Sequence, residues 1–258
     1  MSDLTITLPD GSPRTLPEGA TGADLAADIG PGLAKAAVIV SVGGEGRDLG
    51  RPLADGDVVS VVTADSDEGL HTLRHSTAHV LAQAVLDLWP GATHAIGPPI
   101  EHGFYYDFEL PAGGVFTADD LEAIDARMRE IIAADQAFER FEAGAAEALE
   151  LFADHRYKRE IIEKVTAGGG DAEMAGEASN DGSVTWYRNG EGFVDLCTGP
   201  HVTSTGRLGH FALQKVAGAY WRGDEKQPML QRIYGTAWAD KKALKGHLHR
   251  LAEAEKRD

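Results

Sequence analysis

Four residues with metal-binding or catalytic side chains occur as two pairs with the same spacing. His75 and His79 are four positions apart in HSTAH, and Cys197 and His201 are four apart in CTGPH. On a helix, residues at this spacing project from one face with Cβ atoms about 6 Å apart, so both imidazoles can share a metal, a water or a substrate. Thiolate and imidazole are also preferred zinc ligands. A zinc site and a water-activating hydrolytic site are both open.

Each pair also has a purely structural interpretation. Paired histidines are common on surfaces and in cores, and a free Cys is most often a small buried hydrophobic residue. The zinc-protease signature needs Glu after the first His, where this chain has Ser76, so that class is excluded. Two identical spacings built from rare residue types nevertheless favour a functional site.

Two further polar residues are candidates for the same chemistry. Asp195 precedes Cys197 by two positions, on the same side of a predicted strand, where it could orient an imidazole or accept a substrate amine. Lys158 stands between Arg156 and Arg159, and this context indicates a surface lysine.

The charge distribution limits the partners of the chain. A net charge of −17 argues against a general nucleic-acid binder, but residues 207–258 hold 11 basic and 6 acidic residues. RNA contact should therefore favour this end, where a solvated helix face is an equal interpretation of Lys241, Lys242 and Lys245.

The 258-residue chain predicts a soluble, intracellular protein. No apolar run approaches the roughly 20 residues that span a bilayer, and the first residues lack the features of a signal peptide. We therefore expect a cytoplasmic location. With Cys197 as the single cysteine, no intrachain disulfide can form.

The first 62 residues predict a small β-grasp, ubiquitin-like module. Alternating residues and turn signals predict a hairpin, then a short helix with a Thr21/Asp24 capping box that ends at Gly30, then two strands. The predicted segments are 4–8, 23–29, 36–42 and 58–62. An acidic stretch at 65–69 predicts a domain boundary.

The remainder predicts a larger α+β domain with antiparallel strands. Apolar periodicity predicts helices over 70–89, 118–135, 143–153 and 238–257, and strands over 94–96, 103–110, 184–188, 192–197 and 210–217. Residues 167–183 predict a surface loop. Four aromatic residues could line a pocket, although core packing is the default for them: Tyr105, Tyr106, Tyr220 and Trp221.

Several long blocks of the sequence resemble the N-terminal half of bacterial threonyl-tRNA synthetases. These blocks are HSTAHVLAQAV, AIGPPIEHGFYYDF, VDLCTGPHV and KVAGAYWRGDEKQPMLQRIYGTAWADKKAL. The resemblance implies a TGS-like β-grasp domain at 1–64, an editing domain of the threonyl/alanyl type at 65–237, and a linker helix at 238–258. Because nothing here resembles the aminoacylation core through which that family dimerises, we expect a monomer for this chain and a homodimer for a full-length parent.

The resemblance also implies roles for six residues. His75, His79, Cys197 and His201 match the family's editing pocket, which hydrolyses serine wrongly esterified to threonine tRNA, and Asp195 and Lys158 match its editing Asp and Lys. We assign His75, Lys158 and His79 to catalysis and Asp195, Cys197 and His201 to substrate binding. Nucleophilic attack by Cys197 is a less favoured variant. We expect no metal, with zinc on the quartet as the rival. The alternatives are a zinc-dependent deacylase of the alanyl-editing type and a non-catalytic tRNA-docking module.

Overall fold

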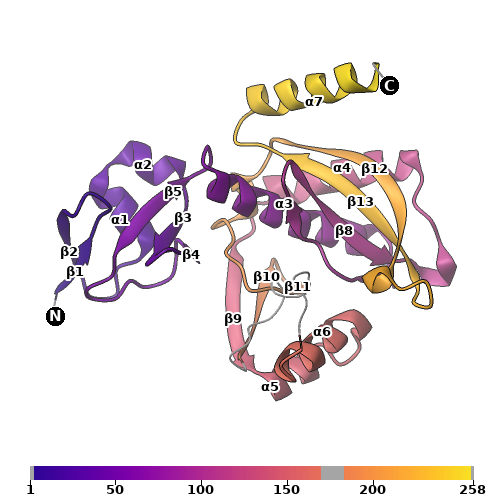
Figure 1. Cartoon of the computed structure of the whole chain (residues 1–258), viewed down its shortest axis with the longest axis horizontal. Helices are drawn as coiled ribbons and strands as arrows, with labels where there is room; N and C mark the ends of the chain where they lie inside the picture. The colour runs from indigo at the N-terminus through magenta and orange to yellow at the C-terminus, as the bar shows by residue number, and fades with distance from the viewer. Residues whose placement is uncertain (1–2, 170–182, 257–258) are drawn as a thin grey trace. The chain divides into compact units, whose positions relative to one another are not determined.

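The computed structural model describes residues 3–169 and 183–256, which form two compact units (Figure 1). The first unit comprises Met1–Leu73 with Gly199–Thr203, and the second comprises Arg74–Thr198 with Ser204–Asp258. Both combine helices with antiparallel sheets, which confirms the predicted α+β class. Most of the loop predicted over 167–183 lies outside the described residues.

The first unit begins with the predicted hairpin and continues into a three-stranded sheet. Strands β1 (Asp3–Thr7) and β2 (Pro13–Pro17) pair antiparallel, and a parallel bridge links Thr7 to Val58. The sheet has the order β4-β3-β5, with β3 at Ala37–Val42, β4 at Glu45–Asp48 and β5 at Val59–Thr63. Strand β4 was not predicted, because its residues, EGRD, carry no apolar alternation.

Two helices complete this unit. Helix α1 (Gly22–Ile29) has the predicted capping box, in which Thr21 and Asp24 each satisfy a backbone N–H of the other residue. Helix α1 ends at Gly30, as predicted. Pro31 then opens a second helix that was not predicted, α2 (Pro31–Ala36), because Pro suits a first helical position. The core contains buried apolar residues from α1 and both sheets, among them Ile6, Leu16, Leu25, Val40 and Val59, and partly buried residues of α2 pack against it.

The second unit begins within a long helix. Helix α3 (Asp67–Leu88) matches the predicted helix, and residues 72–85 are all buried although many of them are polar. Buried polar side chains require hydrogen-bond partners. The middle of α3 is therefore a place where polar contacts must gather.

Two antiparallel sheets accompany α3. The larger has the order β12-β13-β8-β6, with a short β7 beside β8, and the smaller has the order β11-β10-β9. Their bounds are β6 Thr93–His94, β7 Pro99–Ile100, β8 Gly103–Glu109, β9 Phe138–Gly144, β10 Ser183–Asn189, β11 Phe193–Leu196, β12 Phe211–Tyr220 and β13 Met229–Ala237. Strands β9 and β13 were not predicted.

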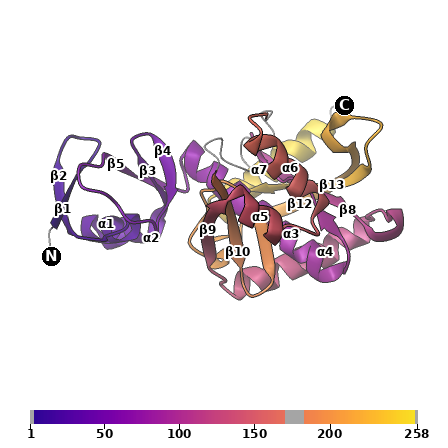
Figure 2. The ribbon, with the colours of Figure 1, turned by 90° about the horizontal axis from the view of Figure 1, so that it is seen from below.

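Four helices complete the second unit. Helix α4 (Ala118–Ala133) opens with a capping box on Thr117 and contacts β12. Helices α5 (Ala145–Leu151) and α6 (Arg156–Thr166) lie beside the smaller sheet (Figure 2), where their apolar residues share one core with β10 and β11. Helix α6 was not predicted.

Helix α7 (Lys241–Glu255) is shorter than predicted. Trp238 is not its first residue, because the Trp238 amide donates to the carbonyl of His210 and continues the pairing of β13 with β12. The side chain of Asp240 instead caps the helix by accepting a hydrogen bond from the amide of Ala243. Four basic side chains of α7 are exposed, namely those of Lys241, Lys242, Lys245 and Arg250. Among the described residues, no helix is both long and apolar enough to cross a membrane.

Candidate functional site

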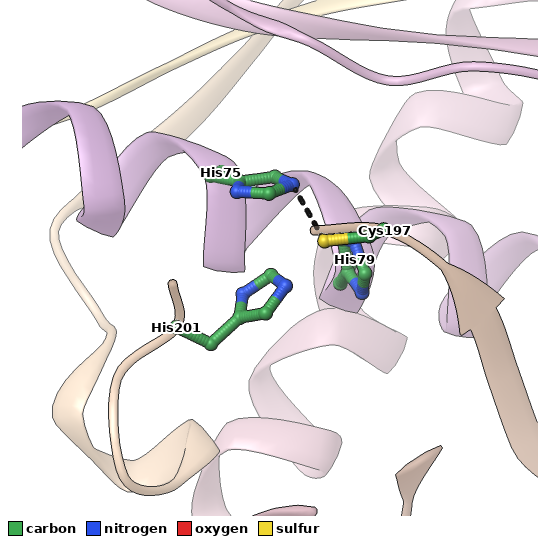
Figure 3. A group of neighbouring side chains, drawn as sticks. All are labelled: His75, His79, Cys197 and His201. Atoms are coloured by element: carbon green, nitrogen blue, oxygen red, sulfur yellow. Dashed lines mark hydrogen bonds between the residues drawn. The ribbon is translucent and has the colours of Figure 1, made fainter. Parts of the chain in front are cut away.

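Helix α3 places His75 and His79 one turn apart on one side, as the spacing predicts (Figure 3). Their ring centroids are 5.1 Å apart and nearly perpendicular. Both side chains are buried, with 8% and 2% of their surfaces exposed. The interpretation of His75 and His79 as surface residues is therefore excluded.

Cys197 directly follows β11 and faces this pair. Its amide donates to the carbonyl of Thr185, and the Thr185 hydroxyl donates to the Cys197 carbonyl at 2.6 Å, so pairing with β10 fixes its backbone beyond the strand end. The buried Sγ lies 3.3 Å from Nε2 of His75. Cys197 is therefore a small buried residue whose thiol also contacts the imidazole of His75.

The backbone turns sharply between Cys197 and His201. Gly199 has a φ of 75°, which favours glycine, and the Gly199–Pro200 peptide bond is cis. The His201 amide donates to Oδ1 of Asp48 at 2.7 Å, and its side chain is buried. One ligand atom from each of His75, His79, Cys197 and His201 lies within 4.8 Å of the other three (Figure 3).

By residue type this quartet fits a zinc ion, since thiolate and imidazole are the usual ligands of tetrahedral zinc. Four protein ligands make a closed site, whereas catalytic zinc sites keep one position for water or substrate. Zinc held by all four side chains would therefore have a structural character.

Asp195 forms the centre of a second cluster beside the quartet. Lys158 Nζ lies 2.8 Å from Oδ1, and the Tyr106 hydroxyl donates to Oδ2 at 2.6 Å. His94 Nε2 lies 3.2 Å from Oδ1, and His79 Nε2 lies 3.4 Å from Oδ2. Burial alone would raise the pKa of Asp195, but the Lys158 ammonium and the two imidazoles outweigh it and hold that pKa well below the usual value. Asp195 is therefore a carboxylate at neutral pH.

Lys158 is completely buried, so its interpretation as a surface lysine was wrong. It heads a stripe of buried residues at helical spacing along α6, followed by Ile161, Ile162 and Val165. The neighbouring arginines suggested a solvated segment, yet the apolar stripe was the signal that this lysine points inward. A fully buried ammonium needs a counter-charge, which Asp195 supplies.

His79 links the two clusters. Desolvation by burial lowers its pKa to about 4, an effect stronger than the opposing attraction of Asp195. The imidazole is therefore neutral near pH 7, when it can donate one hydrogen bond and accept another.

Sequence reasoning missed or undervalued three residues of this site. Tyr106 was a default core residue but binds Asp195, and Lys158 also donates to its hydroxyl at 3.3 Å. His94 and His155 were not singled out, and they lie next to each other beside the carboxylate. No local pattern marks them, because they belong to separate elements brought together only by packing.

Of the other three aromatic candidates, two are core residues, as core packing predicts, and one is exposed. Tyr105 and Trp221 are buried core residues, and Tyr220 is 38% exposed.

Two family descriptions match separate parts of this fold. The TGS domain matches residues 4–63, in the first unit. The second additional domain of threonyl and alanyl tRNA synthetases matches residues 184–234, which include Asp195, Cys197 and His201. The chain thus combines a TGS domain with a domain type of threonyl and alanyl tRNA synthetases.

Whole-chain comparisons find threonine–tRNA ligases. The chain is 53% identical over 99% of its length to the Maricaulis maris enzyme and 50% identical over its full length to that of Pelobacter propionicus. In each case it spans 38% of the length of the relative. The chain therefore resembles the TGS-containing and editing-type N-terminal region of threonine–tRNA ligases.

Proposed function

We propose that this chain hydrolyses the ester of serine wrongly attached to threonine tRNA and spares the threonyl ester. The observation that carries the proposal is the buried Lys158–Asp195 ion pair next to His75, His79 and Cys197, within a domain of the synthetase editing type. Such a reaction takes place on tRNA, and we therefore propose a cytoplasmic location.

A second site is needed because the synthetic site cannot strongly reject serine. Serine lacks one methyl group of threonine, and one such group discriminates by only about 1 to 3 kcal/mol. A hydrolytic pocket too tight for the threonine methyl group admits seryl-tRNA and excludes the correct product. Selectivity then rests on steric overlap.

His75 and Lys158 provide the two functions that ester hydrolysis requires. The reaction needs a group that orients or deprotonates water and a cation for the developing oxyanion. Lys158 is held as a cation by Asp195 at 2.8 Å, which suits it to the oxyanion. His75 faces the interior of the cluster through Nε2 and suits the water.

The remaining residues hold the substrate. Asp195 supplies negative charge that attracts the seryl amine, and neutral His79 beside it can bind either an amine or a hydroxyl. Cys197 and His201 would complete the pocket for the serine side chain and the terminal adenosine. Attack by the Cys197 thiolate is unnecessary because an ester is already activated.

Zinc on His75, His79, Cys197 and His201 defines the second candidate, a zinc-dependent deacylase of the alanyl-editing type. The mutual proximity of the four ligand atoms supports it. When bound, zinc lowers the pKa of a coordinated water and polarises a carbonyl. We favour the metal-free reaction because four protein ligands would leave no open position on the metal.

The test is deacylation of seryl- and threonyl-tRNA of the threonine acceptor by the purified chain. We expect release of serine, little release of threonine, and loss of about 10² to 10³ in rate for Lys158→Ala, as for removal of an oxyanion donor. Lys164→Ala is the matched control, because Lys164 is exposed on the same helix. His75→Ala should also lose the activity.

Three outcomes would contradict this proposal. Equal release of serine and threonine would show that the pocket does not exclude the threonine methyl group. Tight tRNA binding without deacylation would indicate a docking module. Bound zinc after purification without added metal, with activity lost on chelation and restored by zinc, would establish the zinc-dependent candidate.

A further inference from the structure

A buried histidine, His94, and a half-buried histidine, His155, lie beside Asp195 and have no role in the reaction described above. His94 is the last residue of β6, and His155 immediately precedes α6, whose third residue is Lys158. His94 Nε2 lies 3.2 Å from Asp195 Oδ1, and its Nδ1 lies 3.1 Å from Nε2 of His155. The two rings meet edge to face, with centroids 4.5 Å apart. The three residues therefore form a continuous hydrogen-bonded line.

The Asp195 carboxylate determines which ring nitrogens carry protons. A carboxylate only accepts hydrogen bonds, so His94 must donate to it through Nε2–H. In a neutral imidazole the other nitrogen is then an acceptor, and His155 must donate to it through its own Nε2–H. Both rings are thereby fixed as Nε2–H tautomers. Burial lowers the pKa of both, to about 3 for His155, which agrees with neutral rings.

His94 and Lys158 bind the same oxygen of Asp195. With His94 and Lys158 on Oδ1 and Tyr106 and His79 on Oδ2, donors approach each oxygen from two directions. A carboxylate held this way cannot rotate without breaking at least one contact. The orientation of the carboxylate in turn sets the position of the Lys158 ammonium.

The same two histidines separate Asp195 from solvent. A surface pocket is lined by His94 and His155 together with Phe152, Asp154 and Val194, and Asp195 is not part of its lining. Replacing the His94 ring by a small side chain would open a route from this pocket to the carboxylate. Water there would weaken the ion pair by raising the local dielectric constant.

We propose that His94 is a positioning residue that fixes the Asp195 carboxylate, and through it Lys158, while His155 fixes the tautomer of His94. This role deepens the proposed deacylation and rests on it. Neither histidine contacts the substrate or the reacting water.

The first test does not depend on activity. Long-range ¹H–¹⁵N spectra of the imidazoles in the full chain at pH 7 report the tautomer of each ring, with His94→Gln and His155→Gln used for assignment. We expect both rings as neutral Nε2–H tautomers. A neutral Nδ1–H tautomer or a charged ring at His94 would overturn the proposal.

The second test measures seryl-tRNA deacylation at saturating and limiting substrate. His94→Leu should lower kcat by about 10- to 100-fold, as for loss of a residue that orients a ligand, with KM changed far less. His94→Gln keeps a side-chain N–H that can donate to Asp195, so this variant should retain most of the wild-type kcat. His247→Gln is the matched control, because His247 is a buried histidine of the same unit outside this network.

The outcomes separate this role from a structural one and from the proposed function. Thermal unfolding of each variant corrects kcat for the folded fraction. Equal kcat in His94→Leu and the wild type, or equal loss in the Leu and Gln variants, would overturn the positioning role. A wild-type chain that deacylates nothing would overturn the proposed function and the kinetic role, while the spectra would still decide whether the hydrogen-bonded line exists.

Discussion

At the residue scale, the site consists of groups that would be costly to bury alone. Lys158 and Asp195 are both almost fully buried and pair at 2.8 Å. Desolvation makes an isolated buried charge unfavourable by several kcal/mol, which the partner and its hydrogen bonds offset. The pair is thus kept for its charges, which a hydrolytic site needs.

Removing either member of this pair should destabilise the protein. Lys158→Met or Asp195→Asn alone should lower the free energy of unfolding by about 3 to 5 kcal/mol, because one buried charge is left without its partner. The double variant should recover much of that loss, measured by urea denaturation, while deacylation stays absent. Additive losses in the double variant would show that the two charges do not interact.

Cys197 provides a second prediction at this scale. Because the proposed reaction has no thioester, Cys197→Ala should keep deacylation within about tenfold of wild type, far from the loss that follows removal of a nucleophile. Single-turnover kinetics with seryl-tRNA measures it, and Cys197→Ser is the companion variant. Trapping of a seryl group on the chain by acid quench would contradict it.

At the element scale, helix ends and strand ends position the catalytic side chains. Helix α6 carries Lys158 near its first turn, and β11 carries Asp195 just before its end. The stripe of Ile161, Ile162 and Val165 anchors α6 in the core of the smaller sheet. Packing of this stripe therefore fixes how far the lysine reaches.

Ile161→Ala should test this coupling between packing and position. Truncating a fully buried Ile should cost about 2 to 5 kcal/mol in unfolding free energy. Because the cavity lies one turn from Lys158, we expect a lower kcat per folded molecule as well. Thr117→Ala, which removes the α4 cap for about 1 kcal/mol, is the control that should leave kcat unchanged.

At the scale of the whole molecule, several neutral histidines that are buried or half-buried make stability depend on pH. His79 and His155 have pKa values lowered to about 4 and about 3, and that of His94 is lowered too, in each case chiefly by burial. In the unfolded chain these rings take up protons near pH 6.5. Below that value the unfolded state binds more protons than the folded state, so stability falls as the pH falls.

This difference predicts the slope of stability against pH. Between pH 6.5 and 4, each such histidine should lower the free energy of unfolding by up to about 1.4 kcal/mol per pH unit. His155→Gln should make the slope shallower by up to that amount. Urea denaturation at several pH values measures this, and an unchanged slope in His155→Gln would contradict the prediction.

The sequence by itself determined the local features of this protein. Period-two and helical patterns and capping residues located the N-terminal hairpin, the capping box of α1 and the strands β10 and β11, because each depends on neighbours in the chain. It also selected the quartet, since four-residue spacing on α3 and after β11 limits where those side chains can point.

Only the tertiary structure decided how the second cluster forms around Asp195. Tyr106, His94 and Lys158 are separated from it by 89, 101 and 37 positions, and no periodicity connects positions so far apart. The structure also reversed the interpretation of Lys158, because burial depends on which elements cover a side chain rather than on its neighbours in sequence. Hydrogen-bond partners and desolvation, and therefore the charges available for chemistry, arise only when the elements pack.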